Sequence, residues 1–175
     1  MIYEFCAENV TLLEKAMHAG ARRIELCDNL AVGGTTPSYG VTKAAVELAV
    51  NYDTTIMTMI RPRGGDFVYN DMEIAIMLED IRLTAQTGSQ GVVFGVLTAD
   101  KKLDKPNLEK LIAASKGMEI VFHMAFDELS DTDQLEAIDW LSQAGVTRIL
   151  TRAGVSGDSL EKRFAHYHRI LEHAK

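Results

Sequence analysis

The chain has 175 residues, 47% of them hydrophobic and 25% charged, which is the composition of an ordinary globular protein with enough length to bury a substantial core. Its net charge of −7 argues against a general binder of nucleic acids or anionic membranes, because such binding needs clustered Lys and Arg. No apolar run approaches the ~20 residues that span a bilayer, and no signal peptide is visible. We therefore expect a cytoplasmic protein whose two cysteines are reduced thiols.

Strand and helix patterns alternate along the chain. The expected strands are 2–6, 22–27, 54–60, 91–97, 119–123 and 147–151. The expected helices are 9–19, 41–49, 71–87, 106–115, 131–144 and 160–174. Asn70 and Glu73 have the spacing of a capping box, and Gly88 is the expected stop of the same helix. This β-α rhythm predicts a parallel sheet covered by helices.

Six β-α units fit either a doubly wound sheet or an incomplete (β/α)8 barrel. The Gly-x-Gly-x-x-Gly pattern of a Rossmann fold does not follow the first strand. Polar residues at several strand ends favour a barrel mouth, and no change of composition separates a second domain within residues 1–175. A closed barrel needs eight strands, so we expect an open, C-shaped sheet without the C-terminal units. Its gap would be covered by a second copy, in a homodimer or higher homo-oligomer, or by the terminal helix.

Two segments end in the same Glu-x-Cys pattern, Glu4 with Cys6 and Glu25 with Cys27. If the two strands are neighbours, both thiols can reach one ion, and soft thiolates select Cu(I) or Zn over hard cations. Two thiolates can hold Cu(I) linearly, with Met57 or Met59 adding a thioether. The alternative is that each cysteine is a small buried hydrophobic residue.

The two glutamates alternate with the cysteines and should point the same way. Buried carboxylates are costly unless paired, and Arg61 at the end of the third strand is the expected partner of Glu4 and Glu25. Such a group is either a structural ion pair or the polar floor of a small-molecule site, with a carboxylate tuned for acid-base work.

Further charged residues follow the third and fifth strands. His123 can be a general base, a metal ligand or a hydrogen-bonded barrel residue, and Asp127 can orient its imidazole or cap a turn. Arg61 and Arg63 flank a proline in a loop that can bind a phosphate or carboxylate. Alternatively, Arg63 pairs with Asp66 and only holds the loop.

A series of motifs extends from the first strand to the sixth. They are 25–27 with 33–38, 59–69, 91–95 and 122–127, and Arg61-Pro62-Arg63-Gly64-Gly65-Asp66-Phe67 is the most specific. Together they resemble the copper homeostasis family CutC. The resemblance implies a TIM-barrel fold, a cytoplasmic location and a role in handling intracellular copper, without an established reaction. The chain departs from the family at Met124, where an Arg is usual, and at Lys175, beyond which the family continues with a glycine-rich strand and a final strand.

Two functions of different classes follow. The first is a cytoplasmic Cu(I)-binding protein in copper homeostasis that uses Cys6 and Cys27 as metal ligands. The second is a TIM-barrel enzyme acting on a small anionic metabolite. Its catalytic residues would be His123, Glu25 and Asp127, and its substrate-binding residues Glu4, Arg61 and Arg63. The expected partner is accordingly a copper ion or such a metabolite, with no nucleic acid and no membrane.

Overall fold

The computed structural model describes residues 1–154 and 157–174 and contains a six-stranded parallel sheet. The strands are β1 (Glu4–Glu8), β2 (Arg23–Cys27), β3 (Thr55–Met59), β4 (Gly91–Phe94), β5 (Glu119–Phe122) and β6 (Arg148–Ile149). Their spatial order is the order of the chain, from β1 to β6. A doubly wound sheet reverses its strand order part-way, so the sequential order identifies the barrel-like alternative.

Each strand is followed by a helix. The helices are α1 (Leu13–His18), α2 (Tyr39–Ala49), α3 (Asp71–Thr87), α4 (Lys105–Ala114), α5 (Asp131–Gln143) and α6 (Leu160–His173), with short 3-10 turns η1 (Leu30–Val32), η2 (Val50–Tyr52) and η3 (Met124–Glu128). The capping box of α3 is confirmed, because Asn70 accepts from the backbone of Glu73 while the Glu73 carboxylate accepts from the backbone of Asn70. Gly88 ends α3 in the left-handed conformation, with φ 83°.

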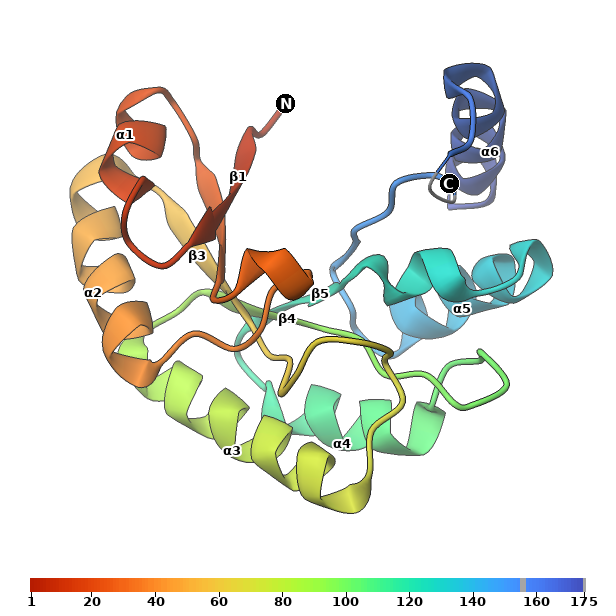
Figure 1. The fold of residues 1–175 in the computed structure, drawn as a ribbon, viewed down its shortest axis with the longest axis horizontal. Helices are drawn as coiled ribbons and strands as arrows, with labels where there is room; N and C mark the ends of the chain where they lie inside the picture. The colour runs from red at the N-terminus through yellow and green to blue at the C-terminus, as the bar shows by residue number, and fades with distance from the viewer. Residues whose placement is uncertain (155–156, 175) are drawn as a thin grey trace.

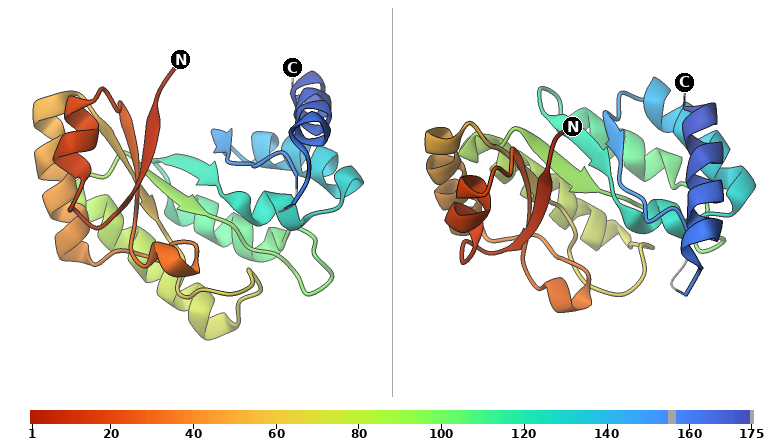
Figure 2. Two further views of the ribbon diagram at one scale, coloured as in Figure 1. Left: turned by 45° about the horizontal axis from the view of Figure 1, so that its top comes forward. Right: turned by 90° about the horizontal axis from the view of Figure 1, so that it is seen from above.

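The sheet curls into half a barrel with helices along its convex side (Figures 1 and 2). This confirms the predicted open β/α sheet. The sheet's edges are β1 and β6, and α6 lies across the opening from β1 in both figures. One alternative placed the terminal helix over the gap, and in both views α6 lies on the β6 side of the opening, apart from β1. It packs against α5 instead, where His166 Nε2 lies 2.8 Å from Gln134 Oε1 and Arg169 pairs with Asp131 at 2.7 Å.

Two hydrophobic clusters fill the space between the sheet and the helices. The larger lies under α3, α4 and α5 around Phe94, Phe122 and Phe126, and the smaller joins β2 and β3 to α1 and α2 through Leu26 and Ile56. Burial of these apolar side chains is the main stabilising term of the half-barrel. No helix among the described residues is long and apolar enough to cross a membrane.

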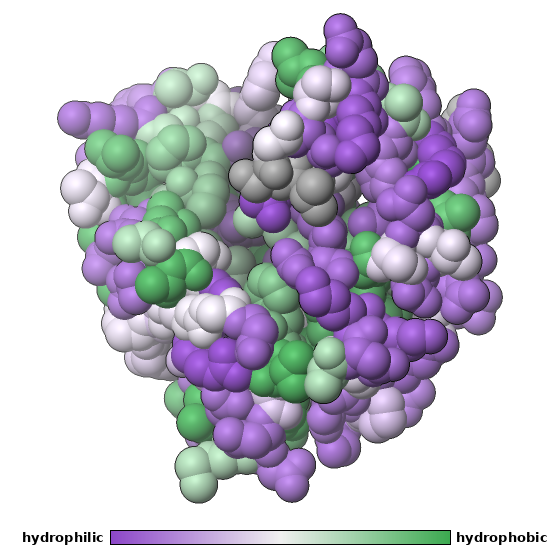
Figure 3. Space-filling model, turned by 45° about the vertical axis from the view of Figure 1, so that its right-hand side comes forward, coloured by the Kyte–Doolittle hydropathy of each residue, from purple (hydrophilic) through white to green (hydrophobic). Residues whose placement is uncertain are grey.

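A third cluster occupies the concave face of the sheet. Its buried members are Cys27, Met57, Met59, Val93 and Val121. On the outer surface, hydrophobic residues gather at the upper left of the face in Figure 3, and hydrophilic residues dominate its right half.

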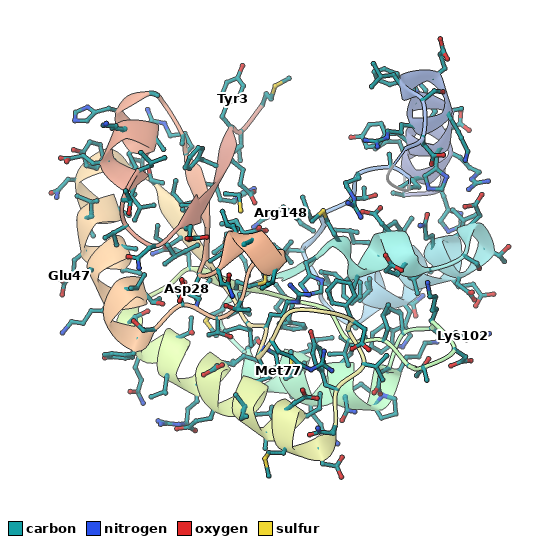
Figure 4. The ribbon with its side chains drawn as sticks, in the orientation of Figure 1. Tyr3, Asp28, Glu47, Met77, Lys102 and Arg148 are labelled. Carbon is teal, nitrogen blue, oxygen red and sulfur yellow. The ribbon has the colours of Figure 1, made fainter. Side chains whose placement is uncertain are left out.

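Arg148 reaches from β6 toward the concave cluster (Figure 4). Its Nη2 lies 3.6 Å from the Met57 sulfur and pairs with Glu119 at 2.5 Å. The concave face thus places a buried thiol near two thioethers, one of them in contact with a guanidinium.

Candidate metal centre

The register of β1 against β2 determines which side chains meet on the concave face. Cys6 lies opposite Glu25, Glu8 opposite Cys27, and Glu4 opposite Arg23. β1 runs to Glu8, two residues beyond the predicted end, so Cys6 occupies the middle of its strand. Because side chains alternate along a strand, Cys6, Glu25 and Cys27 share one face of the sheet.

Three potential ligand atoms converge there. The Cys6 sulfur, a Glu25 carboxylate oxygen and the Cys27 sulfur all lie within 4.8 Å of one another. Both thiols donate to Glu25 Oε1, at 3.5 Å from Cys6 and 3.9 Å from Cys27. The second oxygen, Oε2, is buried and has no hydrogen-bond partner within the described part of the chain. Cys27 is fully buried and Cys6 is exposed, so the cluster opens to solvent on the β1 side.

The electrostatics of the cluster favour protons when no metal is bound. Burial is the main cause that raises the pKa of Glu25, and the nearby Glu4 charge adds to it, while the hydrogen bond from Cys6 acts the other way. The pKa of Cys27 is raised by its hydrogen bonding with Cys6, then by burial and by the Glu25 charge. A metal cation must therefore displace protons here, because only a thiolate is a strong ligand.

The Gly33-Gly34 loop closes the site over Cys27. Gly34 has φ 87°, and a Cβ there would stand 3.0 Å from the Cys27 sulfur and 3.7 Å from the Met59 methyl carbon. The loop backbone thus lies directly against the thiol, with Met59 beside it. This close approach gives the glycine a role beyond plain turn formation.

Arg61 does not pair with the carboxylates, which corrects the expectation from the sequence. Its Nη1 donates to the carbonyls of Val32 and Gly34, both at 2.9 Å, and its Nη2 to that of Gly65 at 2.8 Å. Glu4 pairs instead with Arg23 at 3.3 Å, at the start of β1. Arg61 therefore ties together two loops at the carboxyl ends of the strands, one of them the loop over Cys27.

Arg63 also has a structural role, in line with the simpler of its two alternatives. It pairs with Asp66 at 3.0 Å and with Glu73 at 2.5 Å, and it donates to the Val68 carbonyl at 2.8 Å. These contacts fasten the loop after β3 to the first turn of α3. Neither arginine of this loop contacts the Cys6–Glu25–Cys27 cluster through a side-chain hydrogen bond described in the structure.

His123 is buried and neutral. Its Nδ1 accepts the Ala125 N–H at 3.2 Å, so the proton resides on Nε2, which is buried without a partner among the described residues. The centroid of the His123 ring lies 4.8 Å from that of Phe67, and the Arg61 guanidinium carbon lies over the same Phe67 ring, 4.9 Å from its centroid. Burial, and then the positive charge of Arg61, lower the pKa of His123 to about 3.

The contacts of Asp127 are with residues other than His123. It accepts from the Arg152 backbone at 3.0 Å and pairs with the Arg152 side chain at 3.6 Å, and the Thr151 hydroxyl donates to it as well. Asp127 therefore connects η3 to the segment after β6. Its contacts do not bear out the suggestion that it orients the imidazole.

Comparison with known proteins identifies the family. A profile of the CutC family matches residues 1–173. The chain belongs to the CutC family. A CutC family protein of Enterococcus faecalis is 51% identical to it over 174 residues, which cover 99% of this chain and 83% of that protein.

Solved structures agree with this assignment. The crystal structure of CutC from Streptococcus agalactiae matches with a TM-score of 0.95 and 45% identity, covering 99% of this chain and 83% of the other. An archaeal fructose 1,6-bisphosphate aldolase matches with a TM-score of 0.61 at 15% identity, over 91% of this chain and 62% of that one. The aldolase shows the fold alone. The CutC resemblance and the TIM-barrel-like fold expected from the sequence are both confirmed.

Sequence reasoning missed the close contacts of two glycines in this CutC chain, one at the candidate metal site and one at His123. Gly34 lies against Cys27, and at Gly95 a Cβ would fall 2.6 Å from the His123 ring. The available signals were a glycine pair soon after Glu-x-Cys and a glycine inside an apolar strand run, which indicates close approach of another group.

Proposed function

We propose that this CutC chain is a cytoplasmic Cu(I)-binding protein of copper homeostasis, with Cys6 and Cys27 as its thiolate ligands. The observation that carries the proposal is the convergence of both sulfurs and a Glu25 oxygen within 4.8 Å. Thiolates are the protein ligands that Cu(I) prefers, and a reducing cytoplasm keeps them available. The Streptococcus agalactiae relative, 45% identical, is named as a copper homeostasis protein.

The two thiols suit different steps of metal handling. Cys27 is fixed in β2 and covered by Gly34, so it is a positioned, water-excluded ligand. Cys6 is exposed and can receive an ion from solvent or from a carrier by ligand exchange. Met59 packs in the same cluster as Cys27 and supplies a thioether at the covered side.

Anaerobic titration of Cu(I) against a chromogenic Cu(I) chelator tests this function. We expect the wild type to take one equivalent and the Cys6→Ser, Cys27→Ser double variant to lose that binding. Met72→Ser is the matched control, because it removes the sulfur of an α3 residue that is 74% exposed and is not a member of the concave cluster around Cys27. Equal binding by the double variant and the wild type would contradict the proposal.

We also propose that a second copy of the chain covers the β1 edge. Within the described residues β1 pairs only with β2, while Ile2 and Tyr3 beside it are 57% and 69% exposed. Figure 4 shows Tyr3 at the free end of this strand. Unpaired strand edges with apolar side chains favour association. Light scattering should give a dimer or larger species, and a monomer at micromolar concentration would contradict this.

The enzyme hypothesis has weaker support. In its favour, a cavity of about 480 Å³ lined by residues that include Phe67, Lys101 and Glu128 lies among loops that follow β3, β4 and β5. Against it, Arg61 and Asp127 are occupied by protein groups. A thermal-shift screen with small carboxylate and phosphate metabolites tests it, since a substrate should raise the unfolding temperature.

A further inference from the structure

The third member of the cluster, Glu25, is not needed for linear Cu(I) binding, yet it sits between the two thiols. The residue is 6% exposed, one carboxylate oxygen accepts from both sulfurs, and the other is buried with no partner within residues 1–154 and 157–174. A buried carboxylate oxygen without a partner is costly, so it needs a compensating charge or donor. A metal ion is such a charge.

We propose that Glu25 is a third metal ligand and that the Cys6–Glu25–Cys27 site binds Zn²⁺ with one coordination position open. This inference rests on the proposed thiolate metal site and adds a divalent ion to it.

The distances fit a tetrahedral ion. With Zn–S of about 2.3 Å and Zn–O of about 2.1 Å, the edges of a tetrahedron are about 3.6 Å between S and O and about 3.8 Å between two S atoms. The two sulfurs stand 3.5 Å and 3.9 Å from Glu25 Oε1, and all three ligand atoms lie within 4.8 Å. Binding of Zn²⁺ therefore needs shifts of a few tenths of an ångström between the carboxylate and each sulfur, and it brings the two sulfurs closer together by up to about 1 Å.

The charge of the donor set favours a divalent ion. Two thiolates and one carboxylate carry three negative charges. The site with Zn²⁺ bound therefore has a net charge of −1, and the site with Cu(I) bound has a net charge of −2. In a partly buried site the residual charge is expensive, because desolvation penalises each unpaired charge. A carboxylate oxygen is also a ligand that Zn²⁺ accepts readily and that soft Cu(I) does not need.

The fourth position faces solvent. Gly34 and Met59 cover the Cys27 side, whereas Cys6 is exposed on the edge strand. The cluster of potential ligands found among the described residues has three members. Three protein ligands and one exchangeable position are the arrangement of catalytic zinc sites, in contrast to the closed four-ligand structural ones. A water molecule or a small anion can occupy that position.

Competition titration with a chromogenic zinc indicator tests the inference on the reduced full chain. Glu25→Gln should weaken Zn²⁺ binding at least about tenfold, since even residues that only orient a ligand are worth 10–100-fold. Cu(I) affinity should change by less than the Zn²⁺ affinity, because both thiolates remain. Glu47→Gln is the matched control, since it removes the same charge from a residue of α2 whose side chain is 68% exposed and which is not a member of the cluster.

Cobalt(II) gives a second readout that needs no variant. Wild-type protein should show thiolate-to-cobalt charge transfer and the intense d–d absorption of a four-coordinate ion, and azide should shift the d–d bands by taking the open position.

The outcomes separate this inference from the proposed function. Cu(I) binding without Zn²⁺ binding, or Zn²⁺ binding unaffected by Glu25→Gln, would overturn the third ligand and leave the copper site standing. Cobalt bands that azide does not move would overturn the open position. Loss of neither metal in the double serine variant would overturn both.

Discussion

Burial of His123 makes a specific contribution to the pH dependence of stability. The ordinary pKa of 6.5 is lowered to about 3 in the folded protein by burial and by the Arg61 charge. A lowered pKa on a base means that the unfolded chain binds the proton more tightly. The contribution is therefore complete above pH 6.5 and is lost as the pH falls from 6.5 toward 3.

The magnitude follows from the two pKa values. Between pH 8 and pH 5 the imidazole becomes protonated in the unfolded chain and stays neutral in the folded protein. The lower limit, pH 5, is about 1.5 pH units below the pKa of the unfolded state. At about 1.4 kcal/mol per unit, His123 alone lowers the free energy of unfolding by about 2 kcal/mol across this interval. Glu25 acts in the opposite direction, because its raised pKa favours the folded state at lower pH.

Urea unfolding at pH 8 and pH 5 measures this term. The decrease in unfolding free energy should be about 2 kcal/mol smaller in His123→Gln than in the wild type, since glutamine does not titrate. Each variant is compared with itself at two pH values, so any loss of packing cancels. His168→Gln, which removes an exposed histidine from α6, should keep the wild-type decrease. A His123→Gln decrease equal to that of the wild type would refute a buried neutral imidazole.

Three further predictions concern the site and the loops over it. Cu(I) affinity should fall steeply between pH 8 and pH 6, because protons compete with the metal for the thiolates and the pKa of Cys27 is raised. An affinity that does not change with pH in chelator competition would count against thiolate ligation. Gly34→Ala should lower both stability, by about 1–3 kcal/mol of backbone strain, and Cu(I) affinity, because its φ is 87° and its Cβ meets the Cys27 sulfur at 3.0 Å. Gly20→Ala, with φ 98° and open space around the Cβ, should show the strain without the affinity loss. Arg61→Lys should destabilise the chain by about 3 kcal/mol in urea unfolding, because one ammonium cannot reproduce the three carbonyl contacts; a change below 1 kcal/mol would show that the clamp on the loops is weak.

Local signals predicted the elements of this fold well. The Asn70 capping box, the Gly88 stop and the continuous apolar run that begins at Gly91 are all encoded within a few residues, and the corresponding helix and strand are present. The helix predicted over 9–19 is shorter, Leu13–His18, because Asn9 takes a left-handed conformation with φ 57° and Leu12 provides no side-chain cap.

The pairing of distant segments was less accessible. Arg61 was expected at the carboxylates, but its partners are carbonyls of two loops, and a single sequence does not specify such contacts. The side chain of His166 is only 13% exposed because α6 docks on α5, and no local pattern in the sequence indicates this contact. The proximity of Cys6, Glu25 and Cys27 was predictable, because side-chain alternation and strand adjacency are enough to place them on one face.

The central claim is that Cys6 and Cys27 together hold one Cu(I). X-ray absorption at the copper edge of protein loaded with one equivalent tests it most directly, because it identifies the atoms bound to the metal. The wild type should show a Cu(I) edge and a first coordination shell dominated by two sulfurs. That sulfur shell should disappear in the Cys6→Ser, Cys27→Ser variant. A wild-type shell of only nitrogen and oxygen, or a sulfur shell unchanged in the double variant, would contradict the account.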